Sequence, residues 1–77
     1  MTFDTQCSVI RTKLRYIATE VKELKAHEVF KTEHDGVRDE PEMTANVMLA
    51  YRHLEDATMR LGKAIQAFDG GKSVYDK

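Results

Sequence analysis

The sequence predicts an all-α fold in which an antiparallel two-helix hairpin assembles into a helical oligomer. Apolar residues recur at helical spacing in two long stretches, and a polar segment with a glycine separates them. The chain has 77 residues. A chain of this size buries only about 60% of the surface that its unfolded state exposes. Its one cysteine, Cys7, excludes an internal disulfide, so a metal ion and self-association are the remaining ways to stabilise it.

The first predicted helix covers residues 3–31, within a few residues at either end. Its apolar or small residues alternate in steps of four and three, which is the spacing of a coiled-coil seam rather than of a strand. The members of this first seam are Phe3, Cys7, Ile10, Leu14, Ile17, Val21 and Leu24. Thr2 is suited to cap the helix, and the charge of Asp4 favours the positive end of the helix dipole.

The second predicted helix covers residues 41–69 and follows a polar turn, residues 33–40. Pro41 suits the first turn of a helix, and Gly70-Gly71 should end it. The second seam consists of Val47, Tyr51, Leu54, Thr58, Leu61, Ile65 and Phe68. Two long helices joined by about ten residues should return antiparallel. Residues 1–77 are therefore expected to form a single helical-hairpin domain with a short C-terminal tail.

Large apolar residues also lie outside the two seams, and two helices cannot cover all of them. These residues are Val9, Tyr16, Val29, Met43, Met48 and Met59. Further hairpins are expected to cover them, which again predicts an oligomer.

The balance of charge argues against a general DNA- or RNA-binding protein. Lys plus Arg is 12 and Asp plus Glu is 13, whereas DNA- and RNA-binding proteins usually carry a clear basic excess. No stretch approaches the roughly 20 apolar residues that span a bilayer. We find no export signal in the N-terminal residues, so the free thiol of Cys7 fits a reducing cytoplasm.

No pattern in the sequence predicts catalysis. The histidines and Cys7 lack the spacings typical of metal sites, and no Gly-rich phosphate loop follows a strand. We therefore expect no metal, no cofactor and no catalytic residue, and a binding protein rather than an enzyme.

Tyr16 is the first candidate binding residue. It lies off the first seam, close in sequence to Arg11, Lys13 and Arg15. An exposed tyrosine beside cations can stack on a base while the cations meet its phosphates. A tyrosine that packs on a neighbouring hairpin is an equally good explanation.

Gly62 is the second candidate, within Arg60-Leu61-Gly62. A glycine inside a helix costs about 1 kcal/mol relative to alanine, so close approach of a backbone or of a ligand should compensate. The sequence leaves two explanations for the glycine: an anionic ligand held by Arg60, or close packing of another helix.

Residues 42–67, EMTANVMLAYRHLEDATMRLGKAIQA, look like the second helix of a phage protein family, and residues 69–76, DGGKSVYD, continue the match. The most specific part is the core of residues 54–57 and 59–62, LEDA and MRLG. The first helix is similar in pattern only. The family is the anti-CBASS protein 2 sponges, whose helical-hairpin domain is shared with a Thoeris anti-defence protein.

This resemblance implies a function, an assembly and a location. The chain would sequester cyclic oligonucleotides made by bacterial immune enzymes, and so block CBASS anti-phage defence in the cytoplasm of the infected bacterial host. The resemblance also implies a homohexamer with three sites for cyclic dinucleotides and two separate sites for cyclic trinucleotides. The alternative is a small helical interaction or adaptor protein without a small-molecule ligand.

The resemblance also implies binding residues. In the family, a first-helix tyrosine and a lysine fifteen residues later serve the dinucleotide site, and Tyr16 and Lys31 match them. Lys22 or Lys25 is the alternative partner for the phosphates. Fifteen residues of straight helix span about 22 Å, so a shared site would combine Tyr16 of one protomer with Lys31 of another. An Arg-x-Gly serves the trinucleotide site, and it is matched by Arg60 and Gly62.

Overall fold

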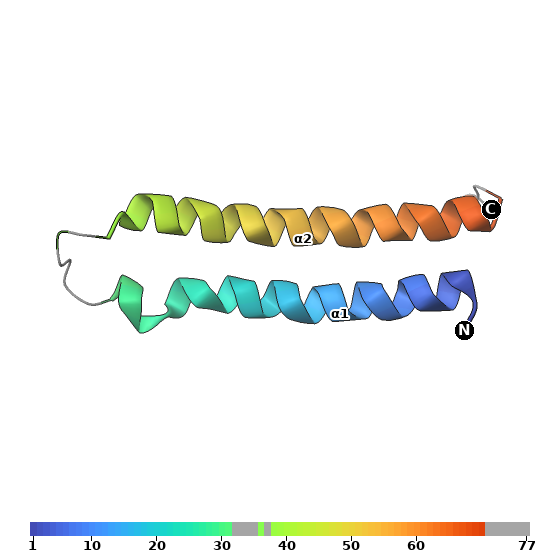
Figure 1. Ribbon diagram of the computed structural model, residues 1–77, viewed down its shortest axis with the longest axis horizontal. Helices are drawn as coiled ribbons and strands as arrows, with labels where there is room; N and C mark the ends of the chain where they lie inside the picture. The colour runs from blue at the N-terminus through green and yellow to red at the C-terminus, as the bar shows by residue number, and fades with distance from the viewer. Residues whose placement is uncertain (32–35, 37, 71–77) are drawn as a thin grey trace.

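The chain forms a two-helix hairpin, which confirms the predicted all-α class (Figure 1). The structure, a computed structural model, describes residues 1–31, 36 and 38–70, so the predicted turn is described in part and the tail from residue 71 onward is not. Helix α1 covers Phe3–Glu23 and helix α2 covers Glu40–Phe68. Two short 3-10 turns, η1 (Leu24–Ala26) and η2 (Glu28–Phe30), follow α1. Assembly into an oligomer stays a prediction.

Both long helices begin at capping side chains. The Thr2 hydroxyl accepts a hydrogen bond from the Thr5 N–H at 3.4 Å, as the sequence predicts. It also donates to the Asp4 carboxylate at 2.6 Å, and this bond holds the pKa of Asp4 below its ordinary value. At the start of α2, the Asp39 carboxylate accepts from the Glu42 N–H at 3.1 Å. These bonds satisfy amide groups that a helix start otherwise leaves without partners.

The first helical segment does not continue as α-helix to residue 31, which corrects the predicted boundary. Residue His27 is extended, with φ −62° and ψ 146°. Its Nδ1 atom accepts the Val29 N–H at 3.0 Å and so caps the second 3-10 turn. This local side-chain bond competes with the helical pattern of backbone bonds, and the chain changes direction there.

The face of α1 that contacts α2 is rotated relative to the predicted first seam. Among the described residues only Cys7 and Ala18 are buried, at 5% and 8% exposure. Arg11, Leu14 and Val21 are half-buried on the same stripe. Alternate members of the predicted seam instead form a row on the flank of α1, with 40–50% of each side chain exposed. We call this the flank row: Phe3, Ile10, Ile17 and Leu24.

The rotation has a packing reason. Small side chains at Cys7 and Ala18 let α2 approach α1 closely, and one partner helix covers only a narrow stripe. The second seam matches better, since all of its members except Phe68 are at least half-buried. The Phe3 and Phe68 rings, with centroids 5.4 Å apart, join the start of α1 to the end of α2.

The hairpin is long and thin. Its radius of gyration is 17.4 Å, whereas a compact domain of this length has about 11.5 Å. The principal extents are 55 × 23 × 18 Å. Within residues 1–31, 36 and 38–70, no third element covers the outer faces of the two helices (Figure 1). Neither helix of the described chain is long and apolar enough to cross a membrane.

Candidate functional site

Tyr16 lies on the outer face of α1, and 70% of its side chain is exposed. At 3.6 residues per turn it points roughly opposite to Leu14 and Ala18, which face α2. Thr12 and Thr19 lie one turn before and after it. Their hydroxyls donate to backbone carbonyls of α1 at 3.1 Å each, and both threonines line the same hollow as Tyr16. The tyrosine therefore stands on an ordered, polar helix surface.

Arg15 lies close to this tyrosine. A shallow hollow of about 260 Å³ is lined by Thr12, Arg15, Tyr16 and Thr19. Arg15 thus accompanies Tyr16, as the sequence predicts. Arg11 does not, because its side chain turns toward α2. The expected grouping of cations around Tyr16 is wrong for Arg11.

Lys31 is exposed at the far end of the helical segment. It caps η2, where its N–H donates to the Glu28 carbonyl at 2.8 Å. Several turns of α1 and both 3-10 turns separate it from Tyr16, and the hollow beside Tyr16 is lined by residues of α1 alone. One chain does not bring the two residues together.

The two alternative lysines differ in their surroundings. The Lys22 Nζ lies 5.7 Å from the centroid of the Tyr51 ring, which is a cation–π contact between α1 and α2. Lys25 is exposed in η1. Lys22 is therefore engaged within the hairpin, whereas Lys25 and Lys31 lie open to a neighbouring molecule.

Arg60 and Gly62 face different directions on α2. The Arg60 Nε lies 3.8 Å from the Asp56 Oδ1, and the two side chains are 69% and 54% exposed. Gly62 is half-buried and faces α1. A Cβ atom at position 62 would lie 3.1 Å and 3.2 Å from the terminal nitrogen and central carbon of the Arg11 guanidinium. The glycine therefore makes room for a side chain of α1.

Arg11 is the residue that sequence reasoning missed at this place. Its Nε donates to the Thr58 carbonyl at 3.0 Å. The contacts of Phe3 with Phe68 and of Lys22 with Tyr51 set an antiparallel register that brings position 11 opposite position 62. The sequence did contain a signal for this pairing. It has a glycine inside the second helix and a long cationic side chain at the matching position of the first.

Around Arg11 the surface is hollowed and carries cations. The hollow, about 390 Å³ in volume, is lined by Arg11, Met59, Gly62, Lys63, Ile65 and Gln66. We call it the Arg11 hollow. Its polar lining consists of two cationic side chains and one amide, and its remaining side chains are apolar.

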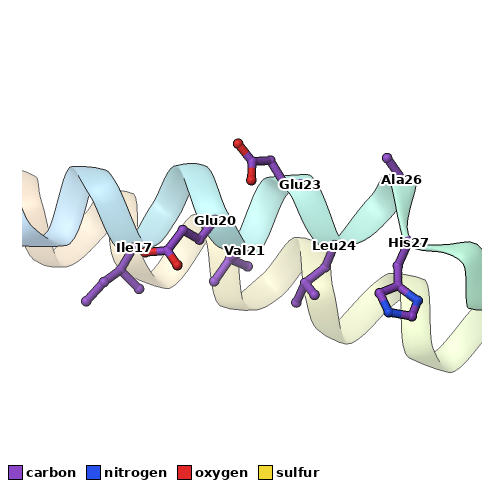
Figure 2. Close-up of a pocket in the computed structure, with 7 residues that line it drawn as sticks. All are labelled: Ile17, Glu20, Val21, Glu23, Leu24, Ala26 and His27. Carbon is purple, nitrogen blue, oxygen red and sulfur yellow. The ribbon is translucent and has the colours of Figure 1, made fainter.

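A third hollow follows the flank row near the end of α1 (Figure 2). Figure 2 shows Ile17, Leu24 and His27 pointing to the same side of the helix, whereas Glu23 and Ala26 point away. The volume is about 560 Å³, and its lining is Ile17, Glu20, Val21, Glu23, Leu24, Ala26 and His27. This surface offers apolar side chains to a partner.

Within the described ranges, no group of three or more histidine, cysteine, aspartate or glutamate side chains could hold a metal ion. Cys7 is a free thiol buried between the helices.

In comparisons with known proteins, no family model, curated protein or solved structure matches this chain.

Proposed function

We propose that the protein sequesters cyclic oligonucleotide signals and so blocks CBASS anti-phage defence. The observation that carries the proposal is the outer face of α1, where Tyr16 is 70% exposed beside Arg15. The resemblance of residues 42–67 to the second helix of the anti-CBASS protein 2 sponges supports the same function. Capture is stoichiometric, because no bond of the ligand is broken.

Cyclic dinucleotides fit a site that two or more copies share. Such a ligand offers two base faces and two phosphate charges. Two Tyr16 rings from different protomers would stack on the bases, while Lys31 side chains of neighbouring protomers neutralise the phosphates. Lys31 is exposed at the far end of the helical segment from Tyr16, which requires this division between copies.

Cyclic trinucleotides would bind at a separate place on α2, where Arg60 and Gly62 match the family. Arg60 is largely exposed, and its side chain is free to turn from Asp56 to a phosphate, since the pair is 3.8 Å apart and solvent-exposed. In this proposal, several protomers meet around a three-fold axis and each brings one arginine.

A hexamer is the assembly that the resemblance favours, and the flank row supports self-association. Its four side chains each keep 40–50% of their surface exposed. Burying a large apolar side chain completely stabilises by about 1.5–3 kcal/mol, so covering the exposed halves would contribute roughly 1 kcal/mol for each residue.

Native mass spectrometry with a panel of cyclic di- and trinucleotides tests the function and the assembly together. We expect a hexamer in which three dinucleotides and two trinucleotides bind at once. Ligand recovered intact after denaturation of the complex would exclude hydrolysis. A hexamer that binds no member of the panel would refute the proposal.

The flank row also favours a second candidate function, that of a small helical interaction or adaptor protein without a small-molecule ligand. Its apolar side chains would then contact a different protein. The two functions separate in one measurement: thermal stabilisation by cyclic nucleotides is expected only for the sponge.

A further inference from the structure

We infer that Arg11 binds a phosphate of the trinucleotide, and that Gly62 serves this site by making room for Arg11 rather than by touching the ligand. The inference rests on the trinucleotide site proposed above for α2. It adds a residue of the first helix to that site and gives the helical glycine a definite role.

The first step is the fit between Gly62 and Arg11. A Cβ at position 62 would lie 3.1–3.2 Å from guanidinium atoms of Arg11. This is closer than ordinary van der Waals contact, so a Cβ at position 62 would require the guanidinium to shift by a few tenths of an ångström from its present position. The glycine, which costs helix stability, is therefore matched to one side chain.

The second step is the fixed orientation of Arg11. Its Nε–H donates to the Thr58 carbonyl at 3.0 Å. A guanidinium has five N–H donors in a rigid plane, so one bond at Nε fixes the direction of the other four. Among the described residues no carboxylate forms an ion pair with Arg11, whereas Arg60 lies near Asp56. A cation already held in place loses less freedom when it binds an anion.

The third step is the chemistry of the Arg11 hollow. Lys63 adds a second cation, Gln66 adds an amide, and Met59 and Ile65 add apolar surface. Of the described residues that line the hollow, none is a carboxylate. Cationic and apolar groups side by side suit a phosphodiester attached to a nucleoside, since the phosphate meets the guanidinium fork and the base or sugar covers the apolar side chains.

Calorimetric titration with a cyclic triadenylate tests the inference. Arg11→Gln should weaken binding about 10- to 100-fold, as for the loss of a charge-assisted hydrogen bond. Arg52→Gln, which removes the same charge from an exposed position of α2, is the matched control and should change affinity by less than about twofold. Helix content and assembly of each variant are checked by circular dichroism and native mass spectrometry.

A double-mutant cycle separates the role of Gly62 from direct contact with the ligand. Gly62→Ala should weaken binding in the wild-type background and have no further effect in Arg11→Gln, because the glycine acts through the arginine. Losses that simply add would show that Gly62 meets the ligand itself and would overturn the inference. A merely structural role of Arg11 predicts lowered thermal stability with unchanged affinity, which would also overturn it.

Chemical modification of arginines in the wild-type protein tests the inference without any variant that could misfold. Phenylglyoxal modifies accessible arginines, and peptide mass spectrometry locates the adducts. Cyclic triadenylate should protect both Arg11 and Arg60, with the exposed Arg52 as the unprotected control. Protection of Arg60 alone would refute the inference and leave the proposed function standing.

The remaining outcome, wild-type protein that binds no cyclic nucleotide, would remove the proposed function. Inorganic pyrophosphate then decides the inference separately. Pyrophosphate binding that Arg11→Gln abolishes would support the Arg11 hollow as an anion site, and binding that is absent or independent of Arg11 would overturn it.

Discussion

Replacement of Tyr16 by alanine tests the proposed dinucleotide site most directly. The ring is 70% exposed and points away from α2, so its loss removes no packing within the hairpin. Exposed substitutions away from caps and buried contacts usually change stability by less than about 0.5 kcal/mol. Alanine is also the better helix former. The variant should therefore keep its helix content and its melting temperature.

The effect on binding follows from stacking. Each aromatic–base stack contributes about 1–3 kcal/mol. A ligand held between two Tyr16 rings loses two such contacts, about 2–6 kcal/mol together, so affinity should fall by at least about 30-fold. Tyr16→Phe keeps the ring and removes only the hydroxyl, and it should retain most of the affinity. The pair of variants separates stacking from hydrogen bonding at this position.

The assay is isothermal calorimetry with the tightest cyclic dinucleotide of the panel, together with circular dichroism and native mass spectrometry. A folded, correctly assembled Tyr16→Ala protein with unchanged affinity would refute the assignment. Loss of assembly in Tyr16→Ala would point instead to the alternative that the sequence left open, a tyrosine that packs on a neighbouring hairpin.

Four further predictions concern other parts of the chain. Lys31→Glu should weaken dinucleotide binding about as much as Tyr16→Ala through charge reversal, measured by the same calorimetry; full affinity would move the phosphate contact elsewhere on the surface. Arg60→Ala should abolish trinucleotide binding and leave dinucleotide binding nearly unchanged, because distant sites behave additively; loss of both ligands from an assembled protein would indicate one site. Ile17→Glu places a charge in the flank row and should dissociate the oligomer without loss of helix, as seen by native mass spectrometry; an intact oligomer would exclude the flank row as its interface. Thr2→Ala removes the cap of α1, should cost about 0.5–2 kcal/mol in thermal unfolding, and should raise the pKa of Asp4 toward its ordinary value in an NMR titration.

The pKa of Asp4 also sets a direction for the pH dependence of the α1 start. The hydrogen bond from Thr2 lowers the folded-state pKa of this carboxyl below its unfolded value. The bond therefore stabilises the helix start above the unfolded pKa, and this stabilisation is lost as the pH falls through the folded-state pKa. Because Asp4 lies in the first turn of α1, the effect is confined to fraying of that turn.

The features that sequence reasoning predicted correctly are local ones. Spacing of apolar residues placed both helices, and Thr2 and Pro41 marked their starts, because caps and periodicity depend on a few neighbouring residues. The break at His27 was missed, since no glycine or proline marks it and a single bond to the Val29 N–H decides it.

The features that were missed depend on how the two helices face each other. The apolar stripe of α1 is wider than one partner can cover, and the sequence does not say which edge of it α2 contacts. The contact face of α1 is rotated from the predicted seam by less than the angle between successive helical residues. This rotation places Ile10 and Ile17 on the flank and brings Arg11 against Gly62. The exposure of Tyr16 was foreseen because it lies far from either edge.

The distribution of side-chain size on α1 bears on why the flank row exists. A hairpin selected only for its own stability would turn its largest apolar residues toward α2. Here the stripe that faces α2 contains the small Cys7 and Ala18 and the cationic Arg11 beside Leu14 and Val21, whereas the flank row consists of four large apolar residues. This arrangement buries less apolar surface within one chain and leaves the flank row exposed, where a second copy could cover it. Tyr16 lies on a third side of the same helix, so in the proposed function one face of α1 contacts α2 and the other two would contact a neighbouring copy and a ligand. A ligand that stacks on Tyr16 would then be held by copies that the flank row has already brought together, and binding should strengthen the assembly by mass action.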